Sequence, residues 1–209
     1  MLKSLYIKTS LIYAGDEVGR GCFAGPLVVG LVACSKKFRV PKWLNDSKIL
    51  TTKNRVKIVS MLKNKCKFGI GIVSPFEIDE LGMTQATKIA LSRASKALNL
   101  TCSVSLPTKI IFDGTVDYSF SNIEFEAVKK GDTKFIEIAI AANFAKVFRD
   151  ELMSLYNNIY GKYNLAKNVG YGTKVHIESL RQFGPTRIHR KLFLRKFNEQ
   201  EKTVGTRKL

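Results

Sequence analysis

The sequence predicts an α/β protein in which helices flank a mixed five-stranded sheet, with a helical part at the C-terminus. Two observations support this fold class. Five short segments are rich in aliphatic and β-branched residues, and longer segments among them carry apolar residues at helical spacing. A chain of 209 residues with 45% hydrophobic and 25% charged residues is long enough for one domain with a sizeable core.

The five predicted strands are short and bounded by polar, glycine or proline residues. The first two are almost continuously apolar, which favours a sheet that is covered on both faces. The pattern does not determine the order of the strands within the sheet. The segments are 11–16, 27–34, 67–74, 109–112 and 123–128.

The first predicted helix follows Thr51, a residue type that often caps helix N-termini, and would turn Val56, Val59 and Leu62 toward the core. A second helix is expected over 75–98, where repeated alanines favour close packing on a sheet. Its expected core-facing residues are Ile78, Leu81, Ala86, Ala90, Ala94 and Ala97.

The longest helical pattern covers 135–160, and a short helix is expected over 174–182. A glycine-rich loop separates these two segments. We expect a single domain over 1–190 and a basic, partly helical tail over 191–209.

The formal net charge of +18 favours a polyanionic partner through neutralisation of phosphates. The sequence contains no apolar run of about 18 residues and no signal-peptide pattern. We therefore expect a cytoplasmic protein that does not bind membranes. We also expect a monomer with no obligatory protein partner. Zinc is not expected, because there are only two histidines and no C-x-x-C pair; reduced thiols are expected at Cys22, Cys34, Cys66 and Cys102.

The run Y-A-G-D-E-V-G-R-G at 13–21 joins the first two predicted strands. Its adjacent carboxylates, Asp16 and Glu17, repel each other and resist burial unless a cation or donor lies between them. Because a strand points neighbouring side chains to opposite faces, both acids serve one site only if the backbone bends there, and the flanking glycines would allow a bend. Taken alone, the run also fits a strand end followed by an acidic turn.

Two further carboxylates lie at the boundaries of predicted elements. Asp113 closes a strand at I-I-F-D-G, and Asp132 precedes the longest helix at K-G-D-T-K. Taken alone, Asp113 also fits a turn and Asp132 a helix cap. Strand ends on one edge of an α/β sheet gather ligand sites, so the four acids can converge there. Two Mg²⁺ or Mn²⁺ ions, roughly 3.5–4 Å apart, would then relieve their repulsion.

A series of ordered motifs resembles those of the type 2 ribonucleases H (ribonuclease HII). The opening D-E-V-G-R-G is similar to the family's D-E-A-G-R-G, and Asp113-Gly114 matches its third acidic position. The other matching motifs are L-N-D-S-K at 44–48, K-G-D-T-K at 130–134, A-K-V-F-R-D at 145–150, G-Y-G-T-K-V-H at 170–176 and F-G-P-T-R-I-H-R at 183–190. The departures, Val18, Thr115 and Asn143-Phe144, leave the acidic positions unchanged.

The resemblance implies a ribonuclease H-like fold and a metal-dependent endoribonuclease. Such an enzyme hydrolyses the RNA strand of RNA–DNA hybrids and incises 5′ to single ribonucleotides in duplex DNA, leaving 5′-phosphate and 3′-hydroxyl ends. It implies that Asp16, Glu17, Asp113 and Asp132 are the catalytic and metal-binding residues.

Substrate selectivity would depend on the ribose 2′-hydroxyl, which distinguishes RNA from DNA. Backbone groups of Gly19, Arg20 and Gly21 can bond that hydroxyl, while the arginine side chain contacts phosphate. By resemblance, Tyr171 would pack on the sugar of the next deoxynucleotide, and Lys48 would hold a backbone phosphate. Without the resemblance, the tyrosine also fits an aromatic that covers a small apolar patch.

Several other basic residues could contact phosphate, although each alone also fits a merely solvated charge: Lys174, Arg187, Arg190, Lys191, Arg195 and Lys196. We expect His176 and His189 to be structural or phosphate-facing rather than general bases. Two other functions fit parts of the pattern. A basic module that only recognises duplex shape would bind equally well in EDTA, and another two-metal nuclease or strand transferase would cut all-DNA substrates.

Overall fold

The structure is a computed structural model that describes residues 2–5, 11–34, 51–62, 64–102, 107–119 and 123–195. The predicted Lys48 contact and tail residues 196–209 lie outside these ranges. The chain forms two compact units, each assembled from separate stretches. The first unit comprises Met1–Val18, Val28–Ile72 and Thr87–Arg149, and the second comprises Gly19–Leu27, Val73–Ala86 and Asp150–Leu209.

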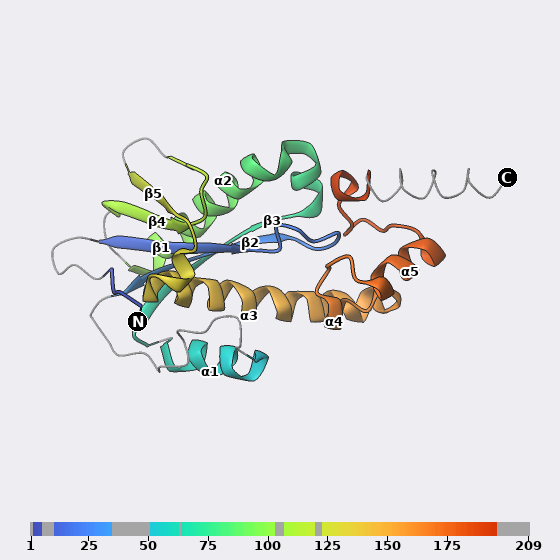
Figure 1. The fold of residues 1–209 in the computed structure, drawn as a ribbon, viewed down its shortest axis with the longest axis horizontal. Helices are drawn as coiled ribbons and strands as arrows, with labels where there is room; N and C mark the ends of the chain where they lie inside the picture. The colour runs from blue at the N-terminus through green and yellow to red at the C-terminus, as the bar shows by residue number, and fades with distance from the viewer. Residues whose placement is uncertain are drawn as a thin grey trace. The chain divides into compact units, whose positions relative to one another are not determined.

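The predicted mixed five-stranded sheet is confirmed (Figure 1). Strand β1 pairs antiparallel with β2 and parallel with β4, which in turn is parallel to β5. The order across the sheet is β3-β2-β1-β4-β5, so β1 is central. The strands are β1 (Ile12–Val18), β2 (Leu27–Cys34), β3 (Cys66–Val73), β4 (Lys109–Asp113) and β5 (Glu124–Val128).

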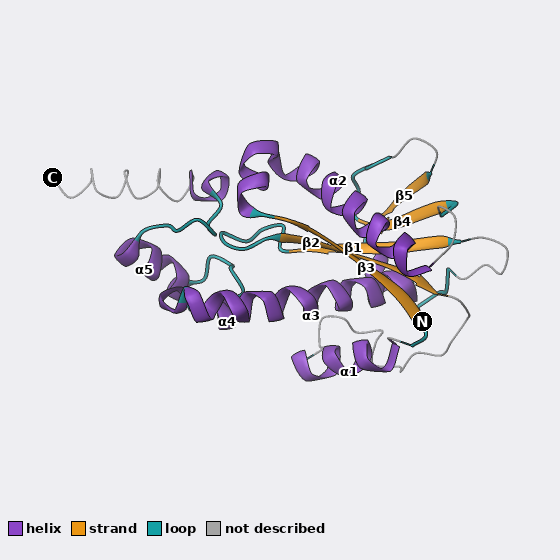
Figure 2. Cartoon of the chain, turned by 180° about the vertical axis from the view of Figure 1, so that it is seen from behind, coloured by secondary structure: helices purple, strands orange, loops and turns teal. Residues whose placement is uncertain are grey.

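Helices α2 (Pro75–Cys102) and α3 (Ile136–Ile159) each run through both units. Within the first unit, residues 87–102 of α2 and 136–149 of α3 cover opposite faces of the sheet (Figures 1 and 2). Glycines allow the helix backbones to approach closely. A Cβ atom on Gly71 of β3 would lie 1.8 Å from the Ala90 carbonyl oxygen of α2. A Cβ atom on Gly30 of β2 would lie 2.9 Å from the Ala141 carbonyl oxygen of α3. The close helix–sheet packing predicted from the alanines is therefore confirmed.

Helix α1 (Thr52–Leu62) begins as predicted, because the Thr51 hydroxyl accepts a hydrogen bond from the Asn54 N–H at 3.3 Å. Its buried residues are Ile58 and Leu62. The prediction that Val56 faces the core is wrong, since this side chain is 46% exposed. At about 100° per residue, Val56 lies almost opposite Ile58 on the helix.

Helix α2 is interrupted at Gly82, whose φ of 74° and ψ of 164° are not helical. The interruption changes the face that the preceding turn presents, so the predicted core residue Leu81 is 45% exposed. Four other predicted core residues of this helix are buried: Ile78, Ala86, Ala90 and Ala94.

Asn143 and Phe144, where the sequence departs from the ribonuclease HII pattern, join α3 to its neighbours in the first unit. The Arg55 guanidinium of α1 donates to Asn143 Oδ1 at 2.7 Å, and the amide of Asn143 donates to the Ala139 carbonyl. The Phe144 ring stacks on Phe68 of β3, with centroids 4.1 Å apart. These three contacts are with α1, α3 and β3, and none of them involves an acidic residue.

The second unit has its own core, built around Ala24, Met153, Tyr163, Leu165, Leu180, Ile188 and Leu194. It contains α4 (Leu165–Asn168) and α5 (Lys174–Phe183). Residues 191–195 are helical. The two carboxylate oxygens of Asp79 accept from the backbone N–H groups of Lys191 and Leu192, each at 2.9 Å, and so cap this helical turn.

Cys22 and Cys66 are buried free thiols, in agreement with the prediction of reduced cysteines. In the described stretches, no helix combines the length and the apolar character that crossing a membrane requires.

Candidate active site

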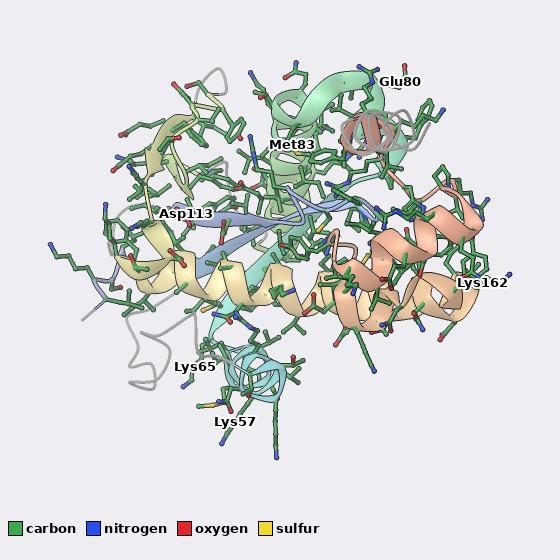
Figure 3. The ribbon with its side chains drawn as sticks, turned by 45° about the vertical axis from the view of Figure 1, so that its right-hand side comes forward. Lys57, Lys65, Glu80, Met83, Asp113 and Lys162 are labelled. Carbon is green, nitrogen blue, oxygen red and sulfur yellow. The ribbon has the colours of Figure 1, made fainter. Side chains whose placement is uncertain are left out.

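The parallel pairing of β1 and β4 places two of the predicted acids on adjacent strands. The register pairs Gly15 with Phe112, so Asp16 and Asp113 follow at neighbouring positions. Asp113 is the last residue of β4 and is labelled in Figure 3. The Gly131 N–H donates to Asp113 Oδ1 at 2.9 Å. This bond holds the 3₁₀ turn Gly131–Thr133, which carries Asp132, against the end of β4.

The Asp16 carboxyl group is the electrostatic centre of the cluster. Asp16 as a whole residue is partly exposed, but its carboxyl group is enclosed by protein. This burial is the main reason that the pKa of the carboxyl group is raised well above the usual value. The negative charges of Glu17, Asp113 and Asp132 raise the pKa further. The Glu17 N–H, which donates to Asp16 Oδ1 at 2.7 Å, acts in the opposite direction. The structure therefore brings the four predicted acids into one electrostatic cluster.

The bend that the flanking glycines would allow is not present at the acidic pair. Strand β1 keeps a regular register with β2 through Asp16 and Glu17, so these side chains start from opposite faces of the strand. Their charges nevertheless interact, because Glu17 raises the Asp16 pKa. Gly15 serves packing rather than bending, because a Cβ atom there would lie 2.4 Å from Leu31 Cδ2. The first glycine that needs its conformational freedom is Gly19, with a φ of 92°.

The donor set fits a hard divalent cation, because all four side chains offer carboxylate oxygens. The negative charges of the neighbouring acids raise the Asp16 pKa, and a bound cation would relieve this repulsion. Over the described ranges, no group of three or more His, Cys, Asp or Glu side chains has an arrangement that could hold a metal ion without rearrangement.

Two predicted substrate-binding segments, far apart in the sequence, are joined within the second unit. The backbone N–H groups of Phe23 and Ala24, which follow Gly19–Gly21, both donate to the Gly170 carbonyl at 2.8 and 3.2 Å. Gly170 has a φ of 87°, and a Cβ atom there would lie 2.2 Å from the Ala24 carbonyl oxygen. The next residue, Tyr171, is 41% exposed.

Arg190 has a different place from the one predicted. It was expected to contact phosphate or to be a solvated charge, but it is fully buried. Its Nε donates to the Gly25 carbonyl at 2.9 Å and its Nη1 to the Arg20 carbonyl at 3.1 Å. Its backbone N–H donates to the Phe23 carbonyl at 2.8 Å. Arg190 therefore supports the loop over 19–25, which contains Gly19–Gly21. No local sequence pattern distinguishes this role from that of the surrounding basic residues.

His176 and His189 are both buried in the second unit, as expected for structural histidines. The alternative expectation, that they face phosphate, is wrong because their ring nitrogens bond protein groups instead.

Comparison with protein families gives one match over most of the chain. The model described as ribonuclease HII matches residues 14–196. A ribonuclease HII from Caldanaerobacter subterraneus is 38% identical over 196 residues, which cover 93% of this chain and 78% of that protein.

Solved structures show the same fold. The ribonuclease H2 from Pyrococcus horikoshii matches with a TM-score of 0.69 and 27% identity, covering 91% of this chain and 98% of that one. The Archaeoglobus fulgidus structure of a PCNA:RNase HII complex contains a chain that matches with a TM-score of 0.73. That match has 24% identity and covers 87% of this chain and 94% of the other.

Proposed function

Because this chain belongs to the ribonuclease HII family, we propose that it is a metal-dependent endoribonuclease. Its substrates are RNA–DNA hybrids and duplex DNA that contains single ribonucleotides. One observation carries the proposal. The buried Asp16 carboxyl, whose pKa is raised, lies in the electrostatic field of the three other acids that match the family pattern.

In this proposal, Asp16, Glu17, Asp113 and Asp132 hold two divalent ions, either Mg²⁺ or Mn²⁺. When bound, such ions lower the pKa of a water molecule and stabilise a leaving oxygen. The Gly131 N–H restrains the orientation of Asp113. Hydrolysis on the 5′ side of the ribonucleotide leaves a 5′-phosphate and a 3′-hydroxyl, and no side-chain nucleophile takes part.

Selectivity for RNA is assigned to the backbone of Gly19–Gly21, which can hydrogen-bond a ribose 2′-hydroxyl. The Arg20 side chain binds phosphate, and the exposed ring of Tyr171 packs on the neighbouring deoxyribose. Lys48 is proposed to hold a backbone phosphate. The net charge of +18 strengthens binding to the polyanion in a salt-dependent way.

The test is cleavage of a duplex that contains one ribonucleotide, with Mg²⁺, Mn²⁺ or EDTA, and with the cut mapped from both labelled ends. We expect metal-dependent incision immediately 5′ to the ribonucleotide. Asp113→Asn should abolish cleavage, whereas Asp117→Asn should not. Asp117 provides a matched control because it undergoes the same substitution four residues away and is exposed, where it accepts from the Ser119 N–H at 2.8 Å.

Three outcomes would overturn parts of the proposal. Equal cutting of the all-deoxy duplex would remove the 2′-hydroxyl as the selected group and favour a general two-metal nuclease. Undiminished cutting by Asp113→Asn would remove this residue from the site. Binding that is insensitive to EDTA, without any cleavage, would identify a module that only recognises duplex shape.

A further inference from the structure

The only two histidines of the chain form a buried pair that takes no part in the proposed chemistry. His176 lies in the first turn of α5, and His189 lies in the segment that leads to residues 191–195. Their Nε2 atoms are 3.1 Å apart, which is hydrogen-bond distance.

The surrounding hydrogen bonds determine where each ring carries its proton. The Thr186 N–H donates to His189 Nδ1 at 3.0 Å, so this nitrogen is an acceptor and the proton of the neutral ring is on Nε2. His176 Nδ1 lies 2.9 Å from the Tyr171 carbonyl oxygen, which can only accept, so here Nδ1 carries the proton. His189 Nε2–H therefore donates to His176 Nε2. Donation runs in one direction from Thr186 through both rings to Tyr171.

This pair is neutral at neutral pH. The pKa of His189 is lowered to about 4, first by burial and then by the proximity of His176. Burial also lowers the pKa of His176. The Tyr163 ring packs 4.8 Å from that of His189, and its hydroxyl donates to the Gly184 carbonyl. Charged residues on the same segments are Lys174, Glu178, Arg181, Arg187, Arg190 and Lys191.

The pair also connects the two predicted substrate-binding segments. His189 forms an antiparallel bridge with Ala24, and the Gly25 N–H donates to the Ile188 carbonyl at 2.9 Å. The loop that follows Gly19–Gly21 is thus fixed to the backbone around His189. Through His176, the same histidine is joined to the peptide of Tyr171.

We propose that His176 and His189 are positioning residues that act as a neutral hydrogen-bonded pair. The pair holds the Tyr171 loop in register with the segment that supports Gly19–Gly21, and so determines how tightly substrate is bound rather than how fast it is cleaved. The inference rests on the proposed function for the binding roles of these two loops. Protonation of either ring puts a second donor where the network needs an acceptor, so acid separates the loops.

The pair itself can be tested without any nuclease activity, by ¹⁵N NMR of the histidine rings in the 209-residue chain. Because the chain has only two histidines, the spectrum reports on these rings alone. We expect a proton on Nδ1 in His176 and on Nε2 in His189. We also expect His189 to titrate near pH 4. The same tautomer in both rings, or titration of both near the ordinary value of about 6.5, would overturn the pair.

The positioning role is tested by steady-state cleavage of the ribonucleotide duplex. In His189→Asn, the amide oxygen can still accept from the Thr186 N–H, but the donor to His176 is lost. A lost neutral hydrogen bond corresponds to a factor of up to about ten in an equilibrium constant, so we expect KM to rise by up to about tenfold with kcat nearly unchanged. His189→Gln, whose amide reaches further, should restore part of the KM, and Glu178→Gln on the exposed face of α5 should change neither constant.

The effect of Tyr171→Ala on KM should be smaller in the His189→Asn background than in the wild type, because both changes disrupt one unit. Additive effects, or a fall in kcat at constant KM, would overturn the positioning role. The outcomes separate the two proposals. The expected tautomers without cleavage would leave the pair intact and overturn the proposed function, whereas cleavage with different tautomers would overturn only the pair.

Discussion

Acidification is expected to destabilise the protein through His189. The ordinary pKa of histidine is about 6.5. In the folded protein, burial and the neighbouring His176 lower it to about 4. Between these two values the unfolded chain binds a proton that the folded protein does not bind. The free energy of unfolding therefore falls as the pH drops through this window, while above pH 6.5 the group has no effect.

The size of this effect follows from the difference between the two pKa values. At about 1.4 kcal/mol per pH unit, a shift from 6.5 to about 4 corresponds to an upper limit of roughly 3 kcal/mol. Residual solvent screening and the coupling to His176 reduce the figure to about 2 kcal/mol. For a chain of this length, each kcal/mol changes Tm by about 2–4 °C, so the loss should be about 4–8 °C.

The assay is thermal unfolding of wild type and His189→Asn at pH 7 and pH 4, with chelator present throughout. Carboxylates titrate in both proteins, so their contributions largely cancel in the difference between the two Tm values. The variant lacks the protonation of His189, and the difference should therefore shift by about 4–8 °C in its favour at pH 4. A difference that is the same at both pH values would refute the reasoning.

Three further predictions concern other parts of the molecule. Asp16→Asn should abolish cleavage but raise the Tm of the protein at neutral pH in the presence of chelator. The reason is that the Asp16 pKa in the folded protein lies above the usual 3.8, so ionisation of this carboxyl lowers stability as the pH rises. The gain in Tm should vanish near pH 4 in the same thermal assay. Gly71→Ala should lower the free energy of unfolding, measured in urea, by about 3 kcal/mol, because the new Cβ atom would lie 1.8 Å from the Ala90 carbonyl oxygen. The control Gly161→Ala should change it by less than about 1 kcal/mol, because no atom lies within 4 Å of that Cβ position. Arg190→Lys keeps the charge but loses the planar donor fork, so it should raise KM and lower Tm together, and an unchanged KM would separate this arginine from the loop over 19–25.

The sequence predicts the strands well because their signal is local. Runs of aliphatic and β-branched residues mark all five strands, and their observed ends lie within two residues of those predicted. The acidic cluster could also be predicted, because three of its members lie on or directly after strands that pair at one edge. Asp16, Glu17 and Asp113 thus followed from the pattern of elements together with the motif order.

The errors arise where packing rather than local pattern decides. In the sequence, Gly15 suggests a bend. In the structure, it is required for packing, because a Cβ atom there would lie 2.4 Å from Leu31 Cδ2 on the neighbouring strand. Leu81 fits a helical stripe only if α2 is continuous, and the φ of 74° at Gly82 breaks it. Nothing in the local sequence distinguishes Arg190 from the basic residues around it, because its partner Gly25 lies 165 positions away. The histidines likewise cannot be recognised as a pair, because they lie 13 positions apart.

The two chemical roles proposed for the D-E-V-G-R-G run correspond to two differently held parts of the chain. The compact units divide within it, since the first ends a stretch at Val18 and the second begins one at Gly19. The acids Asp16 and Glu17 thus belong to the rigid ladder of β1, while the proposed 2′-hydroxyl contacts belong to a loop that Gly170 and Arg190 hold by hydrogen bonds. Gly19, with a φ of 92°, is where the chain leaves the ladder. In the proposed function, three of the metal ligands are fixed by strand pairing, and the fourth, Asp132, lies in the turn that bonds Asp113. The proposed sugar-recognition residues are instead supported by side chains and loop carbonyls. Changes to the supporting residues of the second unit should therefore affect substrate binding without altering the acidic cluster.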